Sequence, residues 1–389
     1  MTSGVPFGNY QYEIYLGGMA GQVPEHPMSW AQWEAAAEAK LDAGPRGYLF
    51  GGAGTEDAMR ANLEAFRRWR IVPRMLRDVS ERAMGTEILG TAMPAPVLMA
   101  PVGVQSILHD EGELASARAA SALGVPYIAS TAGSHTLEQI AAACGDGPRW
   151  YQLYWPRGEE LAASFVARAE AAGYTGLVVT LDTSLLGWRP RDLTGAYLPF
   201  LESVGIANYL ADPVFRSTLP APPEEDPQAA VGQFVGVFAN PTVTWDDLAW
   251  LREQTKLPIL LKGILHPDDA REAAARGIDG VVVSNHGGRQ VDGAIATLDA
   301  LPGVVEAAGD DLAVLLDSGV RSGADAFKAL ALGARAVLLG RPAMWGLAVA
   351  GEQGVRTVLR SFLAELDLTL ALSGHTSLES VGPETLVRA

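Results

Sequence analysis

Gly176–Asp182 (GLVVTLD) is a short apolar run that follows a glycine and ends in two polar residues, Thr180 and Asp182. Near-continuous apolar sequence of this length is typical of a strand buried on both faces, as strands of a parallel sheet are. Runs of the same kind recur along the chain, and a helical pattern follows each of them. The other seven are Val97–Pro101, Tyr127–Thr131, Arg149–Tyr154, Pro258–Gly263, Gly280–Asn285, Ala313–Ser318 and Ala336–Arg341.

The intervening segments are predicted to be helices, each ended by a glycine that can adopt the left-handed conformation of a helix C-terminus. Eight strand–helix repeats favour the α/β class and a closed (β/α)8 barrel, the TIM barrel. An open, doubly wound sheet is the alternative, but no G-x-G-x-x-G follows a strand and there is no P-loop. The clearest helical segments are Glu113–Leu123, Glu159–Ala172, Asp268–Arg276 and Ala324–Leu332.

We expect a single domain over residues 1–389, with the barrel at 96–345 and a C-terminal helical segment at 346–389. Residues 1–95 form an N-terminal extension with predicted helices at Ser29–Asp42 and Asp57–Arg70. The connection after the fourth strand, about 184–244, is far longer than usual and is predicted to be a lid over the site. A disordered surface insertion is the alternative, since its middle, Ser217–Gln228, is rich in proline and acid and should be mobile.

Composition excludes several classes of function. The chain of 389 residues is 48% hydrophobic and carries a formal net charge of −16, which disfavours nucleic acid and anionic membranes as partners. The single cysteine, Cys144, excludes an intrachain disulfide. The N-terminal residues lack a secretory pattern, and no apolar stretch reaches the ~20 residues that span a bilayer. We therefore expect a soluble, cytoplasmic protein.

Nearly every predicted strand ends in a residue that can hydrogen-bond or ionise. Because the C-terminal ends of barrel strands meet at one mouth, these side chains should converge there. Helix capping is the alternative role for a serine such as Ser130. Lys262 is different, because an ammonium at the end of an apolar run must find an electron-rich partner. The set is Pro101, Gly103, Ser130, Gln152, Tyr154, Thr180, Asp182, Lys262, Ser284, His286, Asp317 and Arg341.

Ser284–Arg289 (SNHGGR) is the sharpest local cluster. His286 directly follows a strand, and two glycines after it would let a ligand approach the backbone. Arg289 could hold a carboxylate with two parallel hydrogen bonds, and Asp182 at the same rim could fix the imidazole tautomer of a general base. A structural histidine is the alternative.

A phosphate site is predicted after strands 7 and 8, where barrels commonly bind phosphate. Asp317–Ser322 (DSGVRS) and Gly340–Arg341 supply backbone N–H groups and two guanidiniums there, unless these arginines simply face solvent. The six histidines are scattered and H-E-x-x-H is absent, so no metal site is predicted. The residues thus indicate a phosphorylated ligand, a carboxylate subsite and a histidine base.

SNHGGRQVDG resembles the active-site signature of the FMN-dependent L-2-hydroxy-acid oxidase and dehydrogenase family. The likeness extends nearly end to end, through GYLFGGAG, QLYW, TLDTSLLGWRPRD, LLKG, LLDSGVRSGADAFKALALGA and LLGRP. FGNYQYEIY, LGWRPRDL and NYLADPVF are similar to the lactate 2-monooxygenase branch in particular.

The resemblance implies FMN as cofactor, and a small L-2-hydroxy acid and O2 as substrates, in a homotetramer or homo-octamer. It implies that His286 is the catalytic base, supported by Asp182, and that Arg289 and Arg189 hold the substrate carboxylate. Tyr48 and Tyr154 would hydrogen-bond substrate oxygens. The flavin contacts would come from Pro101, Val102, Gly103, Ser130, Gln152, Thr180, Lys262 and Ser284, and the phosphate contacts from Asp317, Ser318, Gly319, Val320, Arg321, Gly340 and Arg341.

Three outcomes are consistent with this resemblance. If the keto acid stays bound while peroxide forms, lactate gives acetate, CO2 and water, which Gly103 and the long connection favour. If the keto acid leaves first, the products are the keto acid and hydrogen peroxide. A non-catalytic flavin-binding or phosphate-binding barrel is the third possibility.

Overall fold

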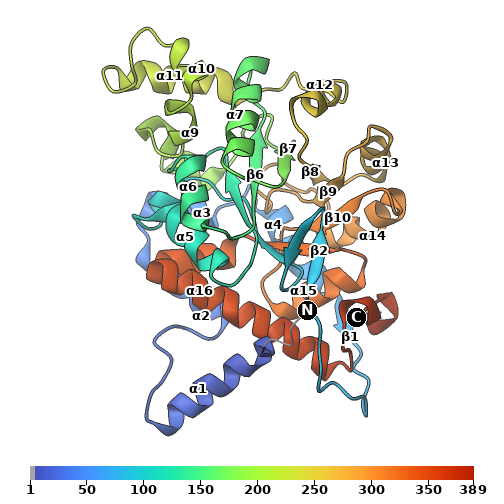
Figure 1. The fold of residues 1–389 in the computed structure, drawn as a ribbon. Coiled ribbons are helices and arrows are strands. Elements are labelled where there is room, and N and C mark those ends of the chain that lie inside the picture. Colours follow the sequence, from blue (N-terminus) through green and yellow to red (C-terminus); the bar gives the residue numbers. More distant parts are fainter. Residues whose placement is uncertain (1–4) are drawn as a thin grey trace.

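A computed structural model describes residues 5–389 of the chain. Eight parallel strands close into a barrel, which confirms the predicted (β/α)8 fold (Figure 1). Seven strands lie within the predicted apolar runs, and β8 extends one residue beyond its run; the last strand pairs with the first through Leu338 and Leu98. The strands are β4 (Val97–Met99), β5 (Tyr127–Ser130), β6 (Arg149–Tyr154), β7 (Leu177–Thr180), β8 (Ile259–Ile264), β9 (Gly280–Val283), β10 (Ala313–Leu316) and β11 (Ala336–Leu339).

Helices follow the strands and surround the barrel (Figure 1). The four helices expected after β4, β6, β8 and β10 begin and end within two residues of their predicted limits. They alternate with the strands along the chain, and their apolar faces are buried against the outside of the barrel. The outer helices are α5 (Gly112–Ser121), α6 (Leu137–Cys144), α7 (Glu159–Ala171), α12 (Asp247–Gln254), α13 (Pro267–Ala275), α14 (Thr297–Ala308), α15 (Gly323–Ala331) and α16 (Arg341–Leu372).

The N-terminal extension contains more regular structure than its pattern predicted. Helices α2 (Trp30–Lys40) and α4 (Asp57–Arg67) are the two expected, whereas α1 (Tyr10–Met19) and α3 (Ala43–Phe50) were not. Helix α1 extends away from the barrel and buries none of its residues (Figure 1). Helix α3 contains Pro45 and two glycines, so its intrinsic propensity is low and its tertiary contacts must stabilise it.

Short strands that the sequence pattern did not predict complete the fold. The strand β12 (Leu386–Arg388) pairs antiparallel with β1 (Trp69–Ile71), so the C-terminal segment is not entirely helical. The hairpin of β2 (Thr86–Ile88) and β3 (Thr91–Met93) contributes apolar side chains to the cluster that fills the barrel interior. The Trp150 indole at the start of β6 donates to Thr91 Oγ1 at 2.8 Å, which fixes the hairpin to the barrel.

The long connection between β7 and β8 is largely helical. Its aromatic side chains Tyr209, Phe215 and Phe234 are buried, and Tyr209 packs edge-on against Phe165 of α7. Asn208 also accepts from the N–H of Leu137, so the connection is attached to the barrel near the end of β5. Its helices are α8 (Pro190–Thr194), α9 (Ala207–Leu210), α10 (Pro213–Ser217) and α11 (Pro227–Phe238). The mobility of residues 217–228 stays a prediction.

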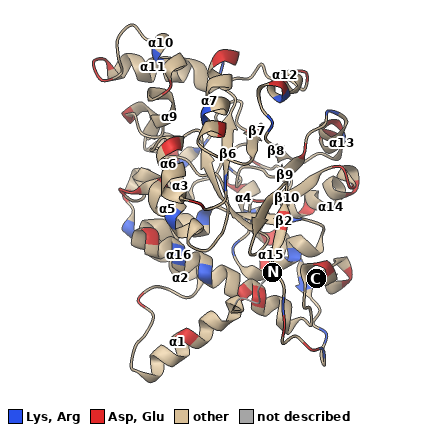
Figure 2. Ribbon diagram, in the orientation of Figure 1, with Lys and Arg blue, Asp and Glu red and all other residues tan. Residues whose placement is uncertain are grey.

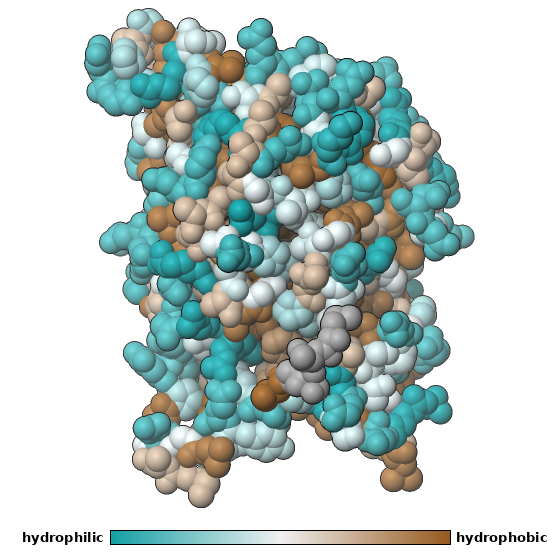
Figure 3. Space-filling model, viewed as in Figure 1, coloured by the Kyte–Doolittle hydropathy of each residue, from teal (hydrophilic) through white to brown (hydrophobic). Residues whose placement is uncertain are grey.

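The surface carries most of the charge. Figure 2 shows Lys, Arg, Asp and Glu mainly on the outer helices and loops, while the strands are nearly free of them. The face seen in Figure 3 is largely hydrophilic, with apolar residues gathered at its lower left, over α1. Within residues 5–389, none of the helices combines the length and the apolar character needed to cross a bilayer.

The hairpin contact can be tested by removing its acceptor. Thr91→Val keeps the side-chain shape but leaves the fully buried Trp150 indole without a partner, so we expect a loss of about 1–3 kcal/mol in the free energy of unfolding. Urea denaturation measures this loss, and Thr91→Ser, which retains the hydroxyl acceptor, is the matched control. Equal stability of the valine and serine variants would contradict the assigned contact.

Candidate active site

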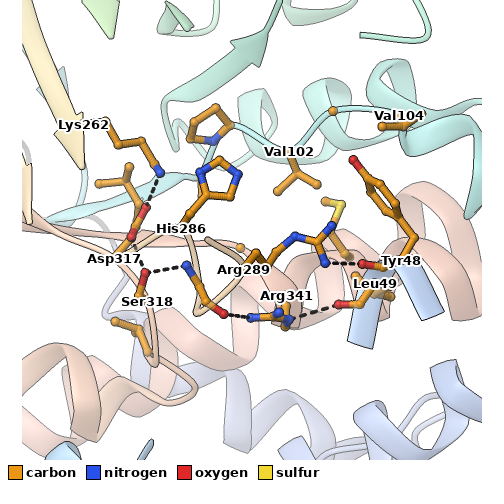
Figure 4. Close-up of a pocket in the computed structure, with 18 of the residues that line it drawn as sticks. Tyr48, Leu49, Val102, Val104, Lys262, His286, Arg289, Asp317, Ser318 and Arg341 are labelled. Atoms are coloured by element: carbon orange, nitrogen blue, oxygen red, sulfur yellow. Dashed lines mark hydrogen bonds and ion pairs between the residues drawn. The ribbon is translucent and has the colours of Figure 1, made fainter. Parts of the chain in front are cut away.

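A cavity opens at the C-terminal ends of the strands. Loops after β4, β9, β10 and β11 line it, together with α3, and Figure 4 shows side chains from these distant segments directed toward one space. This convergence was predicted from the polar ends of the apolar runs. The lining residues predicted from sequence are Tyr48, Pro101, Val102, Gly103, Tyr154, Lys262, His286, Arg289, Asp317, Ser318, Gly319, Val320, Arg321, Gly340 and Arg341.

His286 and Asp182 form a hydrogen-bonded pair at the cavity. His286 Nδ1 lies 2.7 Å from Asp182 Oδ1, and Thr183 Oγ1 contacts both groups, at 3.1 and 3.0 Å. The carboxylate at Nδ1 fixes the tautomer and leaves Nε2 available to a ligand. Burial lowers the pKa of His286, and the positive charges of Lys262 and Arg189 add to this effect against the opposing charge of Asp182. The imidazole is therefore held neutral at neutral pH, as a general base must be.

Lys262 has the electron-rich partners that were expected from its place at the end of an apolar run. Its buried ammonium lies 3.5 Å from Asp317 Oδ2 and 3.8 Å from Asp182 Oδ2, and it donates to Ser284 Oγ at 3.0 Å. Burial opposes its charge, but the two carboxylates raise its pKa. Burial would likewise raise the pKa of Asp182, yet Lys262 and His286 lower it to about 2. Both groups are therefore charged in the folded protein.

Two arginines are neighbours at the cavity: Arg289 lines it, and Arg189 lies beside Arg289. The Arg289 guanidinium stacks 4.7 Å from the centre of the Tyr48 ring and donates to the carbonyls of Tyr48 and Gly51. Arg189, in the long connection, donates to the Arg289 carbonyl at 3.0 Å. Burial and the charge of Arg289 lower the pKa of Arg189 to about 10. Because the charge of Arg289 disfavours that of Arg189, an anion bound near both groups would be favourable.

A second concentration of positive charge lies where the phosphate site was predicted. Arg341 is buried, and its pKa is well below the usual value because of burial and of the neighbouring Arg321 and Arg289. Burial also lowers the pKa of Arg321, which stacks on Trp345. Arg341 Nη1, Nη2 and Nε donate to the carbonyls of Gly287, Gly51 and Leu49, at 2.8 to 3.0 Å.

The backbone of the His286 segment is left-handed over three successive residues. His286 has φ 58°, and Gly287 and Gly288 have φ 68° and 75°. A Cβ on Gly287 would lie 2.8 Å from Arg341 Nη1, and one on Gly288 would lie 2.6 Å from the backbone nitrogen of Met59. Because these glycines have no Cβ, the Arg341 side chain and α4 can lie close to the backbone. The sequence had instead suggested that a ligand would approach the backbone here. A non-glycine residue at positive φ is strained, and such strain clusters at functional sites.

Six predicted site residues lie behind or beside the cavity lining. Asp182 is hydrogen-bonded to the lining residue His286, and Ser284 to the lining residue Lys262. Arg189 is hydrogen-bonded to the backbone of Arg289. Ser130 donates to Gln152 Oε1 at 2.9 Å inside the barrel. Thr180 and Asp182 line a neighbouring pocket, which shares Tyr154 with the main cavity.

Sequence reasoning missed the apolar part of the lining. These residues carry no chemical signal, because an apolar side chain that contacts a ligand has the same sequence pattern as one in the core. Gln290 was also missed; it accepts from Arg189 at 2.7 Å and donates to the carbonyl of Asp182 at 2.6 Å. Its position in SNHGGRQ, next to Arg289, was the available signal. The apolar residues are Leu49, Ala100, Val104, Ile107, Leu108, Leu338 and Met344.

The hydrogen-bond donors at the cavity favour a ligand with many hydrogen-bond acceptors. Arg289 Nη2 and Gln152 Nε2 are buried and have no hydrogen-bond partner in the part of the chain that the structure describes. A buried donor without an acceptor costs about 1–3 kcal/mol, so a bound group that supplies acceptors would stabilise the site. A phosphate beside Arg321 and Arg341, with a ring bearing carbonyls, satisfies this requirement, and FMN has both. Nowhere in residues 5–389 do three or more His, Cys, Asp or Glu residues form a group that could hold a metal ion.

The fold and these donors define a β/α-barrel protein with a site for a phosphorylated ring cofactor. The chain belongs to the FMN-dependent dehydrogenase family, whose model matches residues 37–388. It is therefore an FMN-dependent oxidoreductase that acts on 2-hydroxy acids, and the resemblance stated from the sequence is confirmed.

Relatives align along almost the whole chain. An L-lactate oxidase of Lysinibacillus sphaericus is 46% identical over 376 residues, which cover 97% of this chain and 96% of the relative. The human 2-hydroxyacid oxidase 1 is 40% identical over 359 residues, 92% and 95% of the two chains. A crystal structure of mandelate oxidase with (S)-4-hydroxymandelic acid superposes with a TM-score of 0.83 at 41% identity, covering 93% of this chain and 99% of that one.

The phosphate site can be tested separately from the rest of the cofactor site. Arg321→Leu removes a buried guanidinium, so we expect FMN to bind about 2 kcal/mol more weakly, roughly thirtyfold in Kd. Flavin fluorescence quenching measures this, and riboflavin, which lacks the phosphate, should bind the variant and the parent equally. Arg335→Leu, an exposed arginine before β11, is the matched control. An equal loss for riboflavin would contradict a phosphate role.

Proposed function

We propose that the chain oxidises L-lactate with O2 and FMN, and that it retains the keto acid so that the final products are acetate, CO2 and water. The observation that carries the hydroxy-acid chemistry is a neutral imidazole, paired with Asp182, at the same cavity as the Arg289 guanidinium, with the buried Arg189 beside it. The imidazole serves as a proton acceptor, and the guanidiniums fit a carboxylate.

Each residue has a defined part in this proposal. Arg289 Nη2, which is buried and lacks a partner among residues 5–389, would bind the substrate carboxylate together with Arg189. His286 Nε2 would take the substrate hydroxyl proton, and the adjacent Asp182 carboxylate would stabilise the resulting imidazolium. FMN, when bound, accepts the two electrons from the substrate carbon. Lys262 would stabilise negative charge on the flavin ring, since the ammonium is buried and charged.

The two tyrosines would act as hydrogen-bond donors to substrate oxygens. Burial raises the pKa of Tyr154 far above its usual value, so its hydroxyl keeps its proton at any working pH. Tyr48 lies beneath Arg289, which orders both side chains. In this proposal a carboxylate clamp, a base and two donors would surround one small substrate.

Retention of the keto acid is supported by the wall of the cavity at Gly103. A Cβ at this position would lie 2.6 Å from the Ala132 carbonyl oxygen, so the wall packs backbone against backbone. The long connection, attached at Asn208, would limit product release as a lid. The alternative is an oxidase that releases pyruvate and peroxide, which the 46% identity to a protein named L-lactate oxidase favours. The tetramer or octamer, the cytoplasmic location and O2 as acceptor stay predictions.

Product analysis decides between the two outcomes. Aerobic turnover of L-lactate should give one acetate and one CO2 per O2 consumed, with peroxide well below stoichiometric amounts. Nuclear magnetic resonance of the reaction mixture and a peroxidase-coupled assay measure these products, with catalase present in a parallel sample. Stoichiometric pyruvate and peroxide would overturn retention and establish the oxidase.

The base assignment predicts a specific pH dependence. His286 must be neutral to accept a proton, so the rate of anaerobic flavin reduction by lactate should fall as pH drops through a pKa below 6.5. His286→Ala should keep the yellow bound flavin but lose at least about 10²-fold in that rate. Stopped-flow absorbance at the flavin band measures both effects. Full-rate bleaching by the alanine variant would remove His286 from the mechanism, and no bleaching of the parent protein by any 2-hydroxy acid would favour a non-catalytic barrel.

A further inference from the structure

The wall of the cavity after β4 carries two unused backbone donors. Pro101, Val102, Gly103 and Val104 line the cavity, and Val104 is left-handed with φ 57°. Among residues 5–389 nothing accepts a hydrogen bond from the N–H groups of Val102 or Gly103, whereas the N–H of Val104 is bound to the Ala132 carbonyl at 2.9 Å.

The direction of the Gly103 N–H follows from peptide geometry. The described chain has no cis peptide bonds, so the Val102 C=O and the Gly103 N–H, which share one peptide unit, point in opposite directions. Gln105 Nε2 donates to the Val102 carbonyl at 2.8 Å from the buried side of the loop. The Gly103 N–H is therefore directed away from Gln105 and into the cavity.

The Gln105 side chain can hold this carbonyl in only one orientation of its amide. Nε2 donates to the Val102 carbonyl and to Tyr127 Oη at 3.0 Å, while Oε1 accepts from Ser116 Oγ at 2.7 Å. A flipped amide would set Oε1 against the carbonyl oxygen, which repels it. Gln105, Ser116 and Tyr127 are all fully buried, so water cannot replace any of these partners.

The backbone of Gln105 is held as firmly as its side chain. The fully buried Glu113 accepts from the N–H of Gln105 at 3.0 Å and from that of Ser134 at 2.9 Å, and its other oxygen lies 3.0 Å from His135 Nδ1. The carboxylate thus joins the loop after β4 to the loop after β5. Neither Gln105 nor Glu113 lines the cavity, so neither can act on a ligand directly.

We propose that Gln105 is a positioning residue for the flavin. Its amide, oriented by Ser116 and Tyr127, fixes the Val102–Gly103 peptide so that the Gly103 N–H is presented to the isoalloxazine ring. A donor directed at the ring stabilises the electron density that the ring gains when a nucleophile or a hydride adds to it. The inference deepens the proposed function, but it depends only on FMN binding and not on the identity of the substrate.

Sulfite provides a test that needs no turnover, because it adds to the isoalloxazine ring and bleaches it. With FMN saturating, Gln105→Met, which has no donor for the Val102 carbonyl and adds no charge, should weaken sulfite binding by about tenfold. Ser116→Ala frees the Gln105 amide to rotate and should weaken it by a smaller factor in the same direction. Gln139→Met makes the same chemical change on the exposed face of α6 and should leave sulfite binding as in the parent.

Several readouts separate this role from a merely structural one. Loss of packing alone would lower Tm and FMN affinity but would leave the sulfite Kd of the FMN-saturated protein unchanged. If Gln105→Met does not fold or load FMN, Ser116→Ala and Tyr127→Phe carry the test, since both keep the glutamine. Sulfite binding equal to that of the parent in the FMN-loaded variants overturns the proposal. Should lactate fail to reduce the parent protein, the proposed substrate falls, while the sulfite comparison still decides the role of Gln105.

Discussion

One buried ammonium connects the parts of this site. Lys262 lies within 4 Å of two carboxylates, Asp182 after β7 and Asp317 after β10, in a region closed to solvent. Removing one partner of such a buried ion set leaves an uncompensated charge and costs about 3–5 kcal/mol. The barrel therefore has to close with these three strand ends at their present separations, and His286 is oriented by one of the same carboxylates.

A second group of positive charges at the cavity has no such carboxylate partners between residues 5 and 389. Burial, together with the charges of Arg321 and Arg289, lowers the pKa of Arg341, which depends on backbone carbonyls, including that of Gly287, rather than on acidic side chains. Uncompensated buried charge destabilises the protein alone and becomes favourable when anions bind. Bound FMN and a carboxylate substrate should therefore contribute to the stability of the fold as well as to its chemistry. The positive cavity is consistent with a chain of net charge −16, because the acidic residues lie on the outer helices (Figure 2).

Much of the fold and of the site could be predicted from the sequence. The eight apolar runs gave the strands, because burial on both faces leaves a pattern that needs no tertiary information. Lys262 is the clearest case within the site, since its desolvation cost alone required the anions that the structure provides. Helix α3 and the β2–β3 hairpin were missed because their stability comes from packing against the barrel rather than from local propensity. The carbonyl partners of Arg341 were missed for a related reason: backbone acceptors have no sequence signature.

The proposed base, its aspartate partner and the arginines cannot by themselves determine what becomes of the keto acid. Both the retained and the released outcome need the same base, the same carboxylate clamp and the same cofactor, so the difference must lie in groups that shape the cavity without reacting. The wall at Gly103 is such a group, because its packing against Ala132 leaves no space for a side chain. The buried Gln105 and Glu113 fix the conformation of that wall from behind. Residues that never touch the substrate would thus set both the reactivity of the flavin and the space available to the bound product.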